Sequence, residues 1–131
     1  MVNYVSDAAA SAAGLPYWSP VEALEPAAVL ALQQARLAQQ FEYLLARSAF
    51  YQRKFGSAGL ASGAVRTLED LPRVPFTTKQ ELRDSLNAAP PFGEHLAAPL
   101  AEVIQMQASS GTTGSPSYVA LTRQDALMWQ E

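Results

Sequence analysis

The stretch VIQMQASSGTTGSPSYVALTRQD, residues 103–125, determines the fold that the sequence predicts. Residues 103–108 alternate apolar and polar side chains over part of their length, as a half-buried strand does. The small-residue segment 109–116 follows, and Tyr118–Leu121 can return as a second strand. Thr122–Asp125 has the spacing of a capping box, which predicts the start of a helix. We therefore expect a β-hairpin that leads into a helix.

The segment between the two expected strands has the composition of an anion-binding turn. Gly111 and Gly114 permit unusual backbone angles, and five of the seven residues 109–115 carry hydroxyl groups. Successive backbone N–H groups in such a turn form an anion nest, and hydroxyls add donors for phosphate oxygens. The segment lacks the Gly-Lys-Ser/Thr ending of a Walker loop and the glycine spacing of a dinucleotide fingerprint. A phosphate group is the expected ligand, and a ligand-free hairpin linker is the alternative interpretation.

Upstream of the hairpin, the sequence predicts mostly helices. A capping box with proline at the first helical position begins at Ser19, and Pro26 begins a longer helix that should end near Arg47. Ser48 is expected to cap a short helix that Gly56 and Gly59 end. Thr67 should begin a short capped turn, and Pro72 and Pro75 should hold the next segment extended. A capping box at Thr78–Glu81 then predicts a helix through about Leu86. Residues 1–16 are expected to be a flexible N-terminus.

The composition excludes several classes of function. The 131 residues carry a net charge of -3, whereas bulk nucleic-acid binding needs a basic stripe. The absence of cysteine excludes disulfides, thiolate metal sites and a cysteine nucleophile, and a single histidine, His95, argues against most Ser-His and multi-histidine zinc sites. No signal-peptide pattern and no apolar run of membrane-spanning length is present, so we expect a cytoplasmic protein with no membrane partner.

The run Ala108–Gly114 resembles the phosphate loop of the acyl-adenylate-forming enzymes, which include acyl-CoA synthetases, luciferases and peptide-synthetase adenylation domains. Further segments occur in the order seen in phenylacetate-CoA ligases, namely Tyr17–Pro20, Phe50–Phe55, Leu68–Leu71, Pro75–Lys79 and Leu121–Asp125. The resemblance implies that residues 17–131 are the N-terminal part of an adenylate-forming, AMP-binding domain. The implied fold class is α/β, with a helical N-terminal part followed by a β-hairpin phosphate loop.

The resemblance also implies a reaction. Enzymes of this family activate a carboxylic acid with Mg-ATP to give an acyl-adenylate and pyrophosphate, and a CoA thiol then displaces AMP. The implied acid is aromatic and phenylacetate-like. The loop would hold the ATP phosphates, through Ser109, Ser110, Gly111, Thr112, Thr113 and Gly114. No catalytic or metal-binding residue is carried over, because the family's ribose-binding acids, acid pocket and adenylation lysine are expected beyond Glu131.

Two departures from the family pattern keep other interpretations open. The family commonly has lysine after the second glycine of the loop, where this chain has Ser115, and family members run to several hundred residues. One alternative is therefore a truncated or degenerate adenylation fold that acts as an interaction or regulatory piece. Another is a ligase for a benzoate-, anthranilate- or fatty-acid-like substrate. The unpaired edges of an isolated hairpin also suggest a homodimer.

The remaining chemically versatile side chains have structural explanations. Trp18 is expected to pin the N-terminal segment to the core, and Asp125 to cap a helix. His95 is expected to be a surface or locally hydrogen-bonded histidine, and not a catalytic one. Arg53 and Lys54 form too small a basic patch to predict CoA binding.

Overall fold

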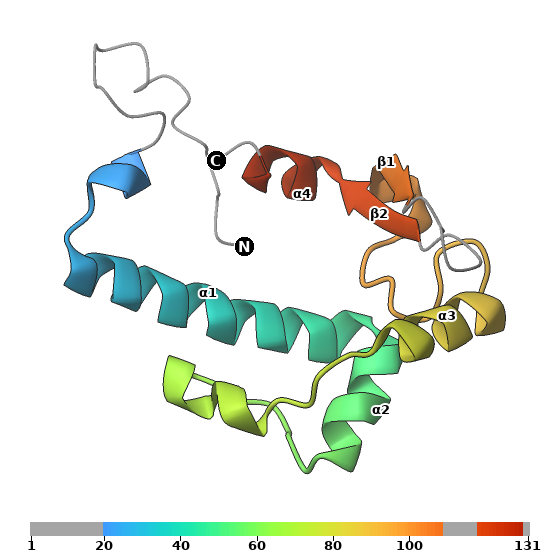
Figure 1. Ribbon diagram of the computed structural model, residues 1–131, viewed down its shortest axis with the longest axis horizontal. Coiled ribbons are helices and arrows are strands. Elements are labelled where there is room, and N and C mark those ends of the chain that lie inside the picture. The colour runs from blue at the N-terminus through green and yellow to red at the C-terminus, as the bar shows by residue number, and fades with distance from the viewer. Residues whose placement is uncertain (1–19, 109–117, 130–131) are drawn as a thin grey trace.

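The computed structural model describes residues 20–108 and 118–129, and these form a helical body followed by a hairpin and a short helix. Figure 1 shows α1 as the long central element, with α2 on one side of it and the hairpin and α4 on the other. In chain order the elements are the 3-10 helix η2 (Pro20–Ala23), α1 (Pro26–Arg47), α2 (Ala49–Ser57), the 3-10 helix η3 (Leu68–Arg73), α3 (Lys79–Ala88), the 3-10 turn η4 (Leu100–Glu102), β1 (Val103–Ala108), β2 (Tyr118–Thr122) and α4 (Arg123–Met128).

The first two predicted α-helices, the one that Pro26 begins and the one after Ser48, are confirmed. Helix α1 begins at Pro26, whose missing N–H would have had no partner in a first turn, and it ends at Arg47. Ser48 separates α1 from α2 with extended backbone, and its hydroxyl accepts a hydrogen bond from the Tyr51 N–H. Ser48 is therefore the N-cap of α2, as its residue type predicts. Helix α2 ends at Ser57, so Gly56 lies inside it and only Gly59, at φ +70°, follows its end.

The hydrophobic core lies where the C-terminal half of α1 meets α2 and the loop after it. Phe41, Phe55, Leu60 and Val65 are buried there, and the rings of Phe41 and Phe55 stack with centroids 4.8 Å apart. Helical spacing predicts Leu30 on the same face, yet Leu30 is 47% exposed. The buried stripe of α1 therefore begins after Leu30, because no described element covers the first turns.

Predicted capping boxes begin three of the short helices. Asp70 accepts hydrogen bonds from the Thr67 backbone, Glu81 from Thr78 and Asp125 from Thr122, at 3.0, 2.7 and 2.8 Å. The box predicted at Ser19 leads only into the four-residue η2. The prediction that Pro72 holds an extended segment is wrong, because Pro72 lies inside η3. Its fixed φ angle suits a 3-10 helix as well as an extended chain.

The two strands pair antiparallel, as the sequence predicts. Ala108 lies opposite Tyr118 and Val103 lies opposite Thr122, with one bulge between Val103 and Gln105. The described part of the protein is thus mostly helical with a two-stranded antiparallel sheet. The predicted flexible N-terminus, residues 1–16, and the aromatic pair Tyr17 and Trp18 lie outside the described residues.

Candidate functional site

The predicted phosphate loop joins the two paired strands. Its candidate residues, Ser109 to Ser115, lie outside the described residues, so the structure describes only the supports of the loop. Ala108 and Tyr118 are cross-strand partners, and they bring the two ends of the loop to neighbouring positions on one ladder. The supports therefore have the arrangement that a loop held between strands requires.

The base of the hairpin is fixed by α4. Thr122 is the last residue of β2 and also the N-cap of α4, where its hydroxyl accepts a hydrogen bond from the Asp125 N–H at 3.3 Å. Leu121 beside it is buried. The strand therefore passes directly into a helix without a flexible connection, which limits how far β2 can move relative to α4.

A second candidate site is an open cavity of about 660 Å³ between α2 and α3. Arg53 and Lys54 on α2 line it, together with Glu81 on α3 and Glu94 in the following loop. Arg53 forms an ion pair with Glu94, and Lys54 forms one with Glu81. Both cations are therefore matched by carboxylates inside the cavity, which does not favour an anionic ligand.

The hydrogen bonds that Glu81 accepts favour its ionised form. The hydrogen bond from the Lys54 ammonium, followed by those from the Thr78 backbone and hydroxyl, lowers the pKa of Glu81 to about 2. Lys54 also lies over the ring of Phe50, with Nζ 5.8 Å from the centroid. The pair thus joins α2 to the N-terminus of α3.

Two buried hydroxyls fasten the loop after α3 to the helices. The fully buried Ser48 hydroxyl donates to the Glu94 carbonyl at 3.0 Å, and the Phe50 N–H donates to the same oxygen at 3.3 Å. The Ser85 hydroxyl accepts from the His95 backbone N–H at 3.0 Å and lies 2.9 Å from Nδ1 of the His95 ring. We call these five residues the polar clasp: Ser48, Phe50, Ser85, Glu94 and His95.

The polar clasp explains the one histidine of the chain. Burial lowers the pKa of His95, so the neutral ring is favoured. A neutral ring can accept the Ser85 hydroxyl proton at Nδ1, while the hydroxyl oxygen accepts from the backbone. This confirms the prediction of a locally hydrogen-bonded histidine. No sequence pattern indicates the contacts of the clasp, because Ser85 lies within a helix and Ser48 between two helices, and both meet their partners only when the loop folds over them.

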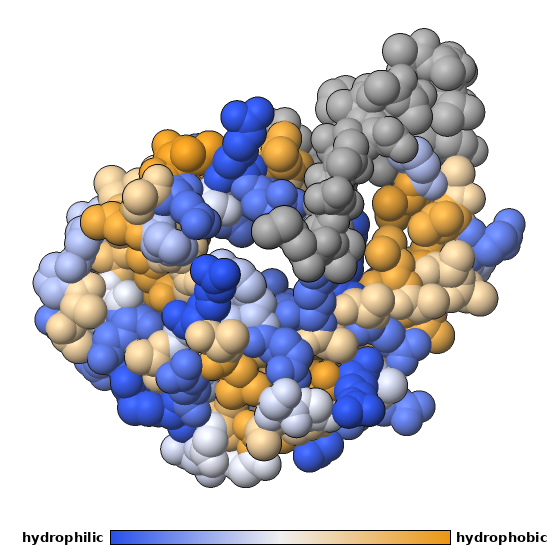
Figure 2. Space-filling view, turned by 180° about the vertical axis from the view of Figure 1, so that it is seen from behind, coloured by the Kyte–Doolittle hydropathy of each residue, from blue (hydrophilic) through white to orange (hydrophobic). Residues whose placement is uncertain are grey.

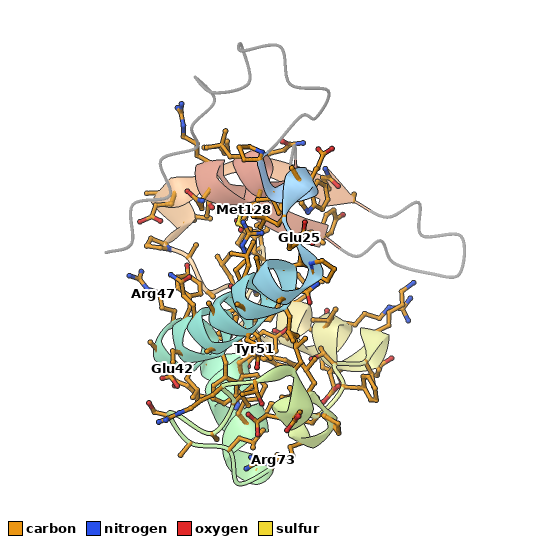
Figure 3. All side chains as sticks on the ribbon, turned by 90° about the vertical axis from the view of Figure 1, so that its left-hand side faces the viewer. Glu25, Glu42, Arg47, Tyr51, Arg73 and Met128 are labelled. Atoms are coloured by element: carbon orange, nitrogen blue, oxygen red, sulfur yellow. The ribbon has the colours of Figure 1, made fainter. Side chains whose placement is uncertain are left out.

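A further polar contact holds the loop after α2 to α1. Glu42 on α1, labelled in Figure 3, accepts hydrogen bonds from the Gly63 N–H at 2.6 Å and the Ser62 hydroxyl at 2.8 Å. These two bonds, that of Gly63 first, lower the pKa of Glu42. Glu42 is therefore occupied in holding a loop and is no free acid–base group.

Within residues 20–108 and 118–129, no group of three or more histidine, aspartate or glutamate side chains is placed to hold a metal ion. No helix in the same ranges is long and apolar enough to cross a membrane.

Comparisons with curated proteins and with solved structures both find CoA ligases. No protein-family model matches the chain. The chain is 42% identical over 115 residues to a phenylacetate-coenzyme A ligase of Thermus thermophilus, which is 88% of this chain and 25% of that protein. It is 38% identical over 110 residues to the phenylacetate-coenzyme A ligase of Escherichia coli, covering 84% of this chain and 24% of that protein. The chain thus spans about a quarter of the length of these curated relatives.

Solved structures agree with the sequence comparison. A 2-hydroxyisobutyryl-CoA ligase crystallised with 2-HIB-AMP and CoA superposes with a TM-score of 0.77 at 36% identity. The match covers 86% of this chain and 24% of that one. The same ligase with 2-HIB-AMP in its postadenylation state gives a TM-score of 0.76 at 33% identity.

Proposed function

This chain is a relative of the phenylacetate-coenzyme A ligase family, and we propose that it forms part of an AMP-forming ligase that joins a phenylacetate-like aromatic acid to CoA. The observation that carries the proposal is the 42% identity to a phenylacetate-coenzyme A ligase over 88% of the chain. The chain spans a quarter of that protein, so the activity belongs to a larger assembly of which these residues supply one part.

The proposed reaction has two steps. A carboxylate oxygen of the acid attacks the α-phosphorus of ATP, the bond to the β-phosphate oxygen breaks, and pyrophosphate leaves. The CoA thiolate then attacks the acyl carbon of the adenylate and AMP leaves. Two observations support this sequence: a solved relative binds an acyl-adenylate, 2-HIB-AMP, and the same relative binds CoA.

This chain would contribute the site for the leaving pyrophosphate. Ser109, Ser110, Gly111, Thr112, Thr113 and Gly114 offer backbone N–H and hydroxyl donors, which suit phosphate oxygens. The pairing of Ala108 with Tyr118 supports a loop that is held at both ends, and such preorganised donors stabilise charge that develops on a leaving group. Mg²⁺ would arrive with ATP and offset the phosphate charge.

Ser115 is the position at which this loop differs from the family pattern. A lysine there would add one charge-assisted contact to phosphate, worth about 1.5–3 kcal/mol. Ser115→Lys is therefore expected to tighten ATP binding roughly tenfold to a hundredfold. Isothermal titration with Mg-ATP measures the change, and Ser117→Lys, two residues away in the same loop, is the matched control. Equal gains from both variants would show nonspecific attraction and contradict the assignment of position 115.

Pyrophosphate release with a panel of acids tests the function itself. The panel contains phenylacetate, benzoate, anthranilate, 2-hydroxyisobutyrate and a fatty acid. The protein is assayed alone and after it replaces the matched 115 residues of the Thermus thermophilus ligase. We expect no turnover from the chain alone and phenylacetate-dependent release from the chimera. A folded chimera that binds no ATP, or that releases no pyrophosphate with phenylacetate, refutes the proposal.

A second candidate function is a non-catalytic interaction or regulatory piece. The serine at position 115 favours it. In that case neither the chain nor the chimera binds ATP, whereas the ligase proposal requires binding in the chimera. The expected cytoplasmic location and the homodimer also stay predictions, and light scattering of the chain at high concentration tests the homodimer.

A further inference from the structure

We propose that Lys79 is an acylation site, at which an aromatic acyl-adenylate transfers its acyl group to Nζ while the ring of Phe76 holds the aromatic end of that group. The source of the acyl-adenylate rests on the proposed function. The site itself is argued from the surroundings of the two lysines, the exposure of Phe76 and the hydrogen bonds that fix the backbone between Phe76 and Lys79.

The chain has two lysines, and their surroundings differ. The side chain of Lys54 is 11% exposed, forms an ion pair with Glu81 and lies over the ring of Phe50. Lys79, the first residue of α3, is exposed. In residues 20–108 and 118–129, no carboxylate forms an ion pair with Lys79. A reagent in solution can therefore reach Nζ of Lys79, whereas that of Lys54 is engaged.

Phe76 places an exposed aromatic ring three residues before Lys79. Its exposed fraction is 93%. Figure 1 shows residues 74–77 as the link between η3 and α3, on the other side of α1 from the hairpin. Figure 2 shows larger apolar areas over the hairpin and over η2 and the first turns of α1, to which this link does not belong. A single ring is too small to mark a protein interface, but it can stack on the phenyl ring of an aromatic acyl group or meet it edge to face.

The capping box of α3 fixes the backbone between the ring and the amine. The Thr78 N–H and hydroxyl donate to a carboxylate oxygen of Glu81 at 2.7 and 2.9 Å, and the Glu81 N–H donates to the Thr78 hydroxyl at 3.2 Å. Glu81 is held in turn by its ion pair with Lys54. An acyl group that contacts Phe76 would therefore meet Nζ of Lys79 at a raised effective concentration.

The proposed step moves the acyl group from oxygen to nitrogen. The unprotonated Nζ attacks the acyl carbon of the adenylate, a C–N bond forms and the C–O bond to AMP breaks. AMP leaves, and the amine proton passes to water. The amide that results carries no charge. Because the N-terminus of a helix disfavours a cation, loss of the Lys79 charge at the first residue of α3 should raise the melting temperature.

Peptide mass spectrometry after treatment with synthetic adenylates tests the site. The chain is mixed with phenylacetyl-adenylate or with acetyl-adenylate, and N-α-acetyllysine in the same solution is the reference amine. We expect Lys79 to be phenylacetylated roughly twofold to tenfold faster than the reference, the factor that one aromatic pair contributes, and to have no advantage with acetyl-adenylate. Phe76→Ala should remove the advantage, whereas Phe76→Tyr should keep it. Leu71→Ala, at another exposed apolar residue in the preceding η3, is the matched control.

The outcomes separate the site from the function. Lys79→Gln and the acylated protein should both melt at a higher temperature than the unmodified chain, whereas Lys79→Arg should melt with it. Equal labelling of Lys54 and Lys79, or a rate at Lys79 that Phe76→Ala leaves unchanged, overturns the proposal. So does a folded version of the chimera described above in which the synthetic reagent labels Lys79 no faster than the reference. Labelling that depends on Phe76, in a chimera that releases no pyrophosphate, upholds the site and refutes the ligase function.

Discussion

Replacing Gly93 with alanine is expected to lower the free energy of unfolding by about 2–5 kcal/mol. Gly93 has φ +81°, a left-handed conformation in which a Cβ atom adds about 1–2 kcal/mol of strain. The new Cβ would also lie 2.6 Å from Nδ1 of His95 and 2.9 Å from Oγ of Ser85. Both atoms belong to the polar clasp, and displacing them leaves buried polar groups without partners, which costs about 1–3 kcal/mol.

Gly59 provides the matched control. It has a similar φ of +70°, yet an added Cβ would meet nothing within 4 Å. Gly59→Ala is therefore expected to show the strain alone, about 1–2 kcal/mol. Gly56→Ala, inside α2 and also in open space, should be neutral or should stabilise the protein by up to about 1 kcal/mol.

Urea unfolding followed by far-ultraviolet circular dichroism gives the three free energies. The difference between Gly93→Ala and Gly59→Ala isolates the clash with the polar clasp. If the two variants lose the same stability, the ring of His95 and the Ser85 hydroxyl can move without penalty, and the energetic role assigned to the clasp is refuted.

Three further predictions address the core and the ionisable groups. Phe41→Ala should lower the free energy of unfolding in urea by about 3–5 kcal/mol, because Phe41 is buried in the core. Leu30→Ala on the same helix should lower it by less than about 1 kcal/mol, because Leu30 is exposed, and equal losses would contradict the position of the core. The pKa of Glu81 in the folded protein is lowered from 4.5 to about 2. Its contribution to the free energy of unfolding is therefore complete above pH 4.5 and is lost as the pH falls toward 2. The stability advantage over Glu81→Gln should therefore shrink across that range, and a constant difference in acid unfolding curves would refute the ion pair with Lys54. The lowered pKa of His95 means that stability declines as the pH falls below 6.5, and a proton NMR titration should place the midpoint of its ring below that value; a midpoint at or above 6.5 would contradict its burial.

The helix starts could be predicted because their signals are local. Thr67, Thr78 and Thr122 each lie three residues before an acidic side chain, and all three pairs form in the structure. The hairpin pairing was predictable for a similar reason, since the two apolar stretches are close in sequence. The position of Pro72 was not, because one fixed φ angle serves two conformations.

Contacts between distant residues gave no such signal. Ser48 and the Glu94 carbonyl are 46 residues apart, and Lys54 and Glu81 are 27 apart. Nothing in the pattern around a serine or a lysine names a partner at that distance, because the partner depends on how the intervening helices pack. The phosphate loop was the most informative part of the sequence, and its assignment as an ATP site stays a prediction.

The polar clasp also makes two positions depend on one another during evolution. The buried Ser85 hydroxyl lies 2.9 Å from Nδ1 of His95, whereas the Glu94 carbonyl that Ser48 contacts is a backbone group that any residue supplies. A replacement at Ser85 or at His95 therefore leaves the other side chain without its partner. We expect epistasis between these two positions in a combinatorial library, with single substitutions depleted and particular pairs enriched.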